Sequence, residues 1–489
     1  MRIDFHAILP ELVLAGTAVL VLVVDLYLER AKVVANYLAL AGTVASGLAL
    51  ASLASGGERS TFGGSFVVDH YALLFKALFL GSLLLVLLIS NRYIDNGTYY
   101  QGEFYFLVLS SFVGMLLMPS SRDLLMLFLS LEIVSATGFI VAGFRKGDVR
   151  SNEGALKFLL IGVLSTAVML FGMSLVYGFT GSLKLTEIAA RLGQVGNEPA
   201  AVMAVFLVIT GFAFKVSAAP FHFWAPDTYE GSPVPVAAYL SVASKAAGFA
   251  GLLQVTFVAF PAYARYWAPA LAVLAALTML LGNVIALAQT NMVRLLAYSS
   301  VAQAGYMLVP FAVGGAAAVD RARAFQAVLI YLLYYGVTNL GAFAVVTLVS
   351  QRQPANLLAD YDGLGRRAPG LAVAMTVFLL SLAGWPPFAG WYAKLVVFQA
   401  ALAAGQTTTT LLAVFMAVMT VVAFFYYLSI CGRIWFAQPA ADAPAGPPAT
   451  SPLARLAIGL STAAVIVLGI LPGLLVQYAP SATLVASRG

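Results

Sequence analysis

Lysines inside apolar stretches are the residues of this sequence that could do chemistry. Lys215 and Lys245 lie in the segment 209–249, where two apolar helical runs flank a break at Pro220. A lysine near the centre of a bilayer costs about 2.5–3.5 kcal/mol on insertion scales, so it usually lines an ion path or pairs with a buried acid. Proline breaks a helix, and non-helical backbone at membrane depth persists only inside protein or beside water. The segment therefore indicates transport.

The basic residues at membrane depth are lysines rather than arginines. Nearly every arginine falls in a loop or at a helix end, whereas the predicted spans contain Lys76, Lys157, Lys215, Lys245 and Lys394. A desolvated lysine titrates readily, while arginine keeps its proton in proteins. The presence of lysine rather than arginine at membrane depth therefore favours proton transfer. Snorkelling is the alternative near a helix end; it could explain Lys157 and Lys76, but not the central Lys245.

A buried lysine needs a counter-charge. Glu132, in FLSLEIVSATGF, is the one acid that we predict deep inside a span. Its coupling to Lys215 could act as an electrostatic switch, and a structural salt bridge is the alternative. His222, beside Pro220, is a secondary candidate for a proton relay. Asp227 and Glu230 are interpreted as residues that cap and position a loop.

A stripe of polar residues accompanies these charges. It could hold a water wire, or equally well form hydrogen bonds between helices. Its members are Tyr331, Tyr335, Thr338 and Asn339, with Ser299, Ser300 and Gln303.

Composition sets the structural class. Of 489 residues, 62% are hydrophobic and only 9% are charged, against roughly 25% charged in soluble domains. We therefore predict an all-α polytopic membrane protein. The net charge of +6 follows from basic cytoplasmic loops and needs no nucleic-acid partner. A single cysteine, Cys431, and three scattered histidines predict no disulfide within the chain, no metal site and no bound cofactor.

With about 20 apolar residues per span, we count about fourteen transmembrane helices. They are expected near 8–28, 33–54, 69–90, 104–119, 123–144, 154–179, 201–224, 233–259, 268–288, 292–313, 322–350, 369–403, 408–437 and 453–477. The longest loops are expected at 181–199 and 437–452. Loop charges place the odd-numbered loops in the cytoplasm and both termini outside, which in bacteria is the periplasm.

The chain also repeats a short pattern. Residues 220–224 and 387–391 share P-F-x-x-W at an offset of 387 − 220 = 167, and two Gly-aromatic pairs share the same offset. Five helices per unit fit this spacing, and an odd number inverts the second unit, as in many transporters with broken helices. We expect four parts: an N-terminal three-helix segment, two inverted five-helix repeats and a C-terminal helix, at 1–103, 104–260, 268–438 and 453–489.

Three motifs together resemble the antiporter-like membrane subunits of respiratory complex I, the NADH–quinone oxidoreductase. They are FKVSAAPFHFWAPDTYEGSPVPVAAYLSVASKAAG, SLEIVSATGF and SLAGWPPFAGWYAKL, and the resemblance covers nearly the whole chain. The family's functional residues would fall on Glu132, Lys215, Lys245 and Lys394, with Lys157 matching a further lysine. One sister subunit of this family has a carboxylate at the position of Lys394, which argues against that subunit here. Another has a long C-terminal lateral helix, which argues against it as well, because only residues 478–489 follow the last predicted span here.

The resemblance implies proton translocation as part of an enzyme complex whose redox chemistry takes place elsewhere. NADH, FMN, iron–sulfur clusters and quinone would be bound by other subunits, and none by this chain. Its partners would be other complex I membrane subunits, the lipid bilayer and protons, in the bacterial inner membrane. The charging of Lys215 would change its coupling to Glu132 and move a proton through Lys245 toward Lys394.

Other classes of function remain open. An Mrp-type cation/proton antiporter subunit shares the same helices and buried residues, although sodium coupling would favour more acids at membrane depth. A membrane subunit of a hydrogenase-type complex is a further alternative. A purely structural scaffold is hard to reconcile with several lysines at membrane depth.

Overall fold

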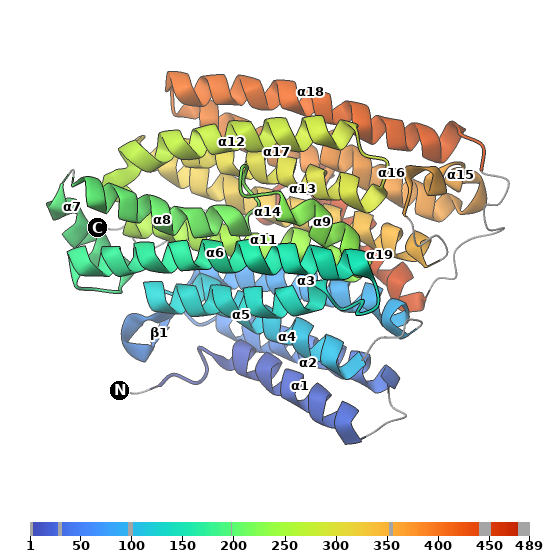
Figure 1. Ribbon diagram of the computed structural model, residues 1–489, viewed down its shortest axis with the longest axis horizontal. Coiled ribbons are helices and arrows are strands. Elements are labelled where there is room, and N and C mark those ends of the chain that lie inside the picture. Colours follow the sequence, from blue (N-terminus) through green and yellow to red (C-terminus); the bar gives the residue numbers. More distant parts are fainter. Residues whose placement is uncertain are drawn as a thin grey trace.

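The computed structural model describes residues 3–27, 32–95, 101–196, 198–351, 356–439 and 451–477. Long helices lie side by side across the molecule, in an order that broadly follows the sequence from α1 to α18 (Figure 1). Twelve helices among the described residues are long and apolar enough to cross a membrane, which confirms the predicted all-α polytopic class. Two further apolar helices, α8 and α16, are shorter, so the number of about fourteen spans stays a prediction.

Residues 9–120 form four long helices, with a small hairpin that the sequence did not predict. Strands β1 and β2 pair antiparallel, with Arg59 opposite Val68, between the second and third helices. The elements are α1 Leu9–Tyr27, α2 Lys32–Ala54, β1 Arg59–Thr61, η1 Phe62–Gly64, β2 Phe66–Val68, α3 His70–Asp95, α4 Gln101–Leu117 and η2 Met118–Ser120.

The next helices surround the first predicted break. They are α5 Leu124–Ala142, α6 Val149–Thr180, α7 Leu185–Val195, α8 Pro199–Lys215 and α9 Trp224–Gly231. Helix α7 corrects the expectation of a plain loop at 181–199. Its buried residues Leu185, Ile188 and Leu192 recur at helical spacing, which gives it one apolar face.

The helix that carries Lys245 runs through the middle of the protein. It consists of α10 Val234–Tyr239, η3 Leu240–Ser244, α11 Lys245–Gln254 and η4 Val255–Ala259. The most apolar part of this span is entirely buried, so protein surrounds it on every side. Both η3 and η4 are π-helical, a conformation that often marks functional sites. Lys245 directly follows η3.

The C-terminal half folds around one long helix, α14. This helix contacts the N-terminal α3, the central α10 and the C-terminal α19, so it joins the ends of the chain. The elements are η5 Pro261–Tyr263, α12 Ala264–Leu287, α13 Met292–Leu308, η6 Val309–Val313, α14 Ala318–Ser350, η7 Leu358–Tyr361, α15 Leu364–Arg367, α16 Pro369–Ala383, α17 Ala389–Ala403, α18 Thr407–Phe436, α19 Pro452–Ile470 and α20 Gly473–Val476.

Two pairs of short helices take the place of continuous spans. Helix α8 ends at Lys215 and α9 begins at Trp224, while α16 ends at Ala383 and α17 begins at Ala389. The breaks thus fall at the prolines that the sequence indicated. At the second break the backbone of Gly384 is left-handed, with a φ of 92°, and a Cβ there would lie 2.9 Å from Cδ of Lys394.

Substitution of Gly384 by alanine is therefore expected to destabilise the second break. A left-handed residue with a Cβ costs roughly 1–2 kcal/mol, and the methyl group would also displace the Lys394 side chain. We expect a lower midpoint temperature of unfolding for Gly384→Ala in detergent. The control is Gly178→Ala on α6, where an added Cβ meets nothing within 4 Å. An equal midpoint for both variants would contradict this account.

Candidate functional site

Lys215 lies at the C-terminal end of α8, with 2% of its surface exposed. Its Nζ donates a hydrogen bond to Oγ of Ser135 on α5, at 3.0 Å. A positive charge is favoured at a helix C-terminus, where the carbonyl groups lack helical partners. The break after Lys215 thus provides part of the electrostatic environment that lets a lysine remain inside the protein.

Glu132 lies on α5 one turn before Ser135, and it acts electrostatically on Lys215. The carboxylate is only partly buried, and its Oε1 accepts a hydrogen bond from Oγ1 of Thr166 at 2.9 Å. The hydrogen bond of Lys215 goes to Ser135 instead. The two charges are therefore coupled through space without a direct hydrogen bond, and Glu132 lies in the middle of its helix, as expected, with its side chain partly covered by protein.

Lys245 is 1% exposed and faces α13. Its Nζ donates to both the carbonyl oxygen and the side-chain Oγ of Ser300, at 2.8 and 2.6 Å. Neither acceptor is charged. Lys245 is thus held by neutral oxygens alone among its hydrogen-bond partners in the described part of the chain.

Lys394 lies on α17 and reaches back across the second break. Its Nζ donates to the carbonyl oxygen of Ala383, the last residue of α16, at 2.9 Å. The same atom lies 4.8 Å from the centre of the Tyr306 ring, within the range of a cation–π contact. Both broken helices therefore bring a lysine to the C-terminal end of their first half.

Two cavities meet at Lys394. The smaller has a volume of about 10 Å³ and touches Gln303, Tyr331 and Thr338 of the polar stripe; this is close to the smallest space that holds one water. The larger, about 220 Å³, lies on the side of α18 and touches Trp391 and Thr420. Lys394 therefore separates the polar interior from a wider space.

The polar stripe forms a connected set of hydrogen bonds. Ser299, next to Ser300 in sequence, lies 2.5 Å from the hydroxyl of Tyr427, and Nε2 of Gln303 donates to the same hydroxyl at 3.4 Å. The hydroxyl of Tyr331 donates to Oε1 of Gln303 at 2.5 Å. Since Gln303 and Tyr331 line the small cavity, this set ends beside Lys394, and it begins at Ser299, the residue next to the Ser300 that Lys245 contacts. Tyr427 was missing from the predicted stripe because it lies far along the chain, on α18.

Two further stripe residues, Tyr335 and Asn339, bind the central helix, and Tyr335 also lines the small cavity. Tyr335 donates to the carbonyl oxygen of Ser241, and Nδ2 of Asn339 donates to Oγ of Ser241. These bonds tie α14 to the π-helical turn before Lys245. Hydrogen bonding between helices thus accounts for part of the stripe, while another part lines a cavity, and a water wire stays a prediction.

His222 lies in the first break, between α8 and α9. Its side chain is buried, and its Nδ1 has no hydrogen-bond partner among the described residues. The charge of Lys245 acts on its ring. Such a buried ring nitrogen without a partner is rare in a purely structural histidine.

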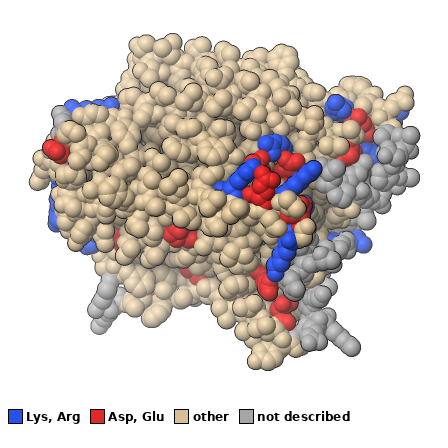
Figure 2. All heavy atoms as spheres, in the orientation of Figure 1, with Lys and Arg blue, Asp and Glu red and all other residues tan. Residues whose placement is uncertain are grey.

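Lys157 belongs to a charged cluster at the surface rather than to the interior. Its Nζ contacts Oδ2 of Asp227 and Oε1 of Glu153, both at 2.7 Å, and 43% of its side chain is exposed. Arg294 on α13 contacts Asp227 at 2.6 Å and Glu230 at 2.9 Å. Acidic and basic side chains gather in one patch on a mostly uncharged face, with further charges mainly toward its edges (Figure 2). Asp227 and Glu230 thus join α6, α9 and α13 by ion pairs, which corrects their interpretation as caps.

A buried ion pair between α1 and α3 was not predicted from the sequence. Nζ of Lys76 on α3 lies 2.7 Å from Oε1 of Glu11 on α1, with side chains 0% and 5% exposed. Glu11 lies in the first turn of α1, and Lys76 is held by this ion pair rather than by snorkelling. The two residues lie far apart in the sequence, so no local pattern indicated that they would pair.

Comparison with known proteins accounts for this arrangement. Residues 121–420 match the family described as NADH:quinone oxidoreductase/Mrp antiporter, transmembrane. The NADH-quinone oxidoreductase subunit N 2 of Streptomyces griseus is 48% identical over 423 residues, which are 82% of this chain and 78% of that protein. The chain belongs to the subunit N family of NADH-quinone oxidoreductases.

Solved structures agree with this family. A chain of respiratory complex I from Thermus thermophilus with bound aureothin is 34% identical, with a TM-score of 0.78, and the match covers 96% of this chain and all of that one. A chain of the Mrp complex from Dietzia is 22% identical, with a TM-score of 0.82, over 98% and 97% of the two chains. The second likeness shows a shared fold alone. Sequence identity therefore favours subunit N over an Mrp antiporter.

We expect the Glu11–Lys76 ion pair to stabilise the fold only when both partners are present. Removing one partner of a buried ion pair costs about 3–5 kcal/mol, because the other charge is left uncompensated. We expect Lys76→Met and Glu11→Gln each to lower thermal stability strongly, and the double variant to recover much of the loss. The control is Lys184→Met, whose side chain is 49% exposed. Additive losses in a double-mutant cycle would show that the pair is not coupled.

Proposed function

We propose that this chain moves protons across the membrane as subunit N of an NADH–quinone oxidoreductase. NADH oxidation and quinone reduction take place in other subunits, which bind NADH, FMN, the iron–sulfur clusters and the quinone. This chain holds none of these cofactors and contributes proton transfer to the enzyme. Its neighbours are other membrane subunits of complex I and lipid, in the bacterial inner membrane, with both termini in the periplasm.

The polar groups between Lys245 and Lys394 are the observation that best supports this function. Lys245 donates to Ser300, and the adjacent residue Ser299 meets Tyr427. Gln303 donates to Tyr427 and lines the cavity beside Lys394. Hydroxyl groups both donate and accept, so each can pass a proton on, whereas the amide of Gln303 only orients its neighbours. Water between the hydroxyl groups and in the small cavity would complete the route.

Lys215 and Glu132 act as the switch at the start of this route. Because Lys215 hydrogen-bonds Ser135 and not Glu132, a small shift of either charged side chain changes their coupling without breaking an ion pair. A protonated Lys215 is stabilised by the carboxylate and by the end of α8. When that stabilisation weakens, the proton moves on to Lys245, and His222 in the first break is the relay between the two lysines.

Repulsion between neighbouring ammonium groups then drives the proton forward. Lys245 and Lys394 have neutral hydrogen-bond acceptors, so a second positive charge nearby is not screened by a carboxylate partner and favours release. Release takes place at Lys394, which borders the wider cavity beside α18. Lys157 holds the surface cluster together and has a secondary role on the entry side.

In this proposal, the four parts expected from the sequence have different roles. The first inverted repeat, 104–260, contains the switch, and the second, 268–438, contains the release site. The N-terminal segment 1–103 and the C-terminal helix in 453–489 pack against them.

The central test is Lys215→Ala in membrane vesicles that carry the complete complex. We expect NADH-driven proton pumping and NADH–quinone electron transfer to be lost together, because the two reactions are tightly coupled. Assembly is checked by the recovery of all subunits. If the assembled variant kept both activities in full, Lys215 would have no role in proton transfer.

A second variant tests the route itself. Tyr427→Phe removes the hydroxyl that Ser299 and Gln303 share, and we expect both activities to fall at least fivefold. The matched control is Tyr334→Phe, because Tyr334 is also buried and its hydroxyl donates to the carbonyl oxygen of Pro472, away from the route. Equal activities in the two variants would exclude Tyr427 from the pathway.

A further inference from the structure

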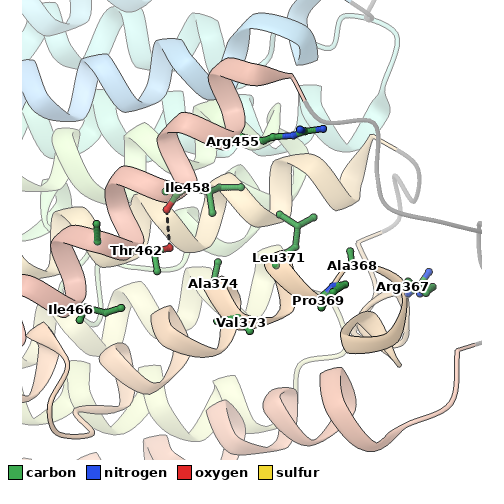
Figure 3. A pocket seen from close by; sticks show the side chains of 13 residues that line it. Arg367, Ala368, Pro369, Leu371, Val373, Ala374, Arg455, Ile458, Thr462 and Ile466 are labelled. Carbon is green, nitrogen blue, oxygen red and sulfur yellow. Dashed lines mark hydrogen bonds between the residues drawn. The ribbon is translucent and has the colours of Figure 1, made fainter.

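A long groove lies between α16 and α19, away from the proton route. Its volume is about 650 Å³. Apolar side chains form its walls, among them Leu371 and Ala374 from α16 and Ile458 and Ile466 from α19. Arg367 and Arg455 lie at one end and Ile466 at the other (Figure 3). The groove is thus charged at one end and apolar along the rest.

The length of the groove matches the thickness of one leaflet of a bilayer. Both helices begin at the arginine end, directly after Ala368 and Ser451, so that end lies where the chain enters the membrane. From Arg455 to Ile466 the helix advances by 466 − 455 = 11 residues. At 1.5 Å per residue this is about 16 Å, close to half of the roughly 30 Å hydrocarbon core.

Among the described residues, arginines outnumber acidic residues at the arginine end. They are Arg366, Arg367, Arg433 and Arg455, against the two aspartates Asp360 and Asp362. Arg433 contacts Asp362 at 3.2 Å. Nη2 of Arg367 donates to the backbone carbonyl oxygens of both aspartates, which uses two of its five donors. A further anion would therefore find both charge and donors here.

We propose that this groove binds an anionic phospholipid, with its phosphate on Arg367 and Arg455 and an acyl chain along the apolar walls. Arginine pairs well with phosphate oxygens. The loops at this end follow the basic bias of the cytoplasmic side, where the leaflet is rich in anionic lipids. The bound lipid would seal α19 against α16. This proposal is independent of the proton route.

A transmembrane helix of a neighbouring subunit is the competing occupant. A helix with its side chains is about 10–12 Å across, so a 16 Å length fills roughly 1,300–1,800 Å³. This is two to three times the 650 Å³ of the groove. An acyl chain is much thinner, and the paired arginines suit a phosphate headgroup. Size and charge therefore favour the lipid.

One glycine makes the groove testable without disturbing its walls. An added Cβ at Gly459 on α19 meets nothing within 4 Å, so Gly459→Leu would extend into the groove and block it. Gly178 on α6 is equally open, and Gly178→Leu is the matched control. For the charged end, the Arg367→Gln/Arg455→Gln double variant is compared with Arg366→Gln, because Arg366 is exposed and does not line the groove.

The experiment uses the complete complex in phosphatidylcholine vesicles with a small amount of photoactivatable phosphatidylglycerol. The reactive group lies midway along one acyl chain, and labelled peptides are identified by mass spectrometry. We expect label on α16 and α19 of the unmodified protein, with at least fivefold less when the probe is phosphatidylcholine. Gly459→Leu and the double arginine variant should each reduce the phosphatidylglycerol label at least fivefold, and both controls should keep it.

Three outcomes would overturn the proposal. Equal labelling by the two lipids would mean an apolar surface without headgroup selection. An unlabelled groove on a chain labelled elsewhere would mean that a protein helix covers it. Full labelling of Gly459→Leu would mean that the lipid lies outside the groove. Since Gly459→Leu keeps both arginines, it tests the groove even if the arginine variants assemble poorly.

Discussion

The protein is organised around the need to solvate ammonium groups at membrane depth. A buried charge is tolerated only when hydrogen-bond acceptors or opposite charges replace the lost water. Lys215 has the hydroxyl of Ser135, Lys245 has two oxygens of Ser300, and Lys394 has the last carbonyl of α16. Each acceptor is neutral, so each lysine is supported without being fixed in its charged form by a contacting carboxylate.

Broken and irregular helices provide this support. In a continuous α-helix the backbone carbonyls are occupied, and only at an end do they become available. Both broken helices end beside a lysine, and the third lysine follows a π-helical turn. The irregular backbone lies inside the protein, where neighbouring helices cover it. Irregular structure and buried charge therefore occur together because each depends on the other.

The Glu11–Lys76 pair shows the opposite solution. There a lysine contacts a carboxylate directly, inside the N-terminal segment. A carboxylate in direct contact attracts the ammonium group and makes its proton difficult to move. The same residue type is thus structural in one half of the molecule and suited to proton transfer in the other, according to its nearest partner.

The sequence by itself determined the membrane class, the positions of the breaks and the identity of the buried lysines. These follow from hydropathy, proline and the cost of charge in an apolar stretch, all of which are local. Lys245 was recognisable because it stands in the middle of an apolar run, far from any helix end.

Only the tertiary structure decided which partners those residues have. Tyr427 contacts Ser299, which lies 427 − 299 = 128 residues earlier in the chain. Lys76 contacts Glu11, which lies 76 − 11 = 65 residues earlier. Composition and periodicity contain no information about such contacts, because they depend on how separate helices pack. Glu132 illustrates the limit, since its place in an apolar run indicated a position at membrane depth, while only the packing shows that it is partly covered and bonded to Thr166.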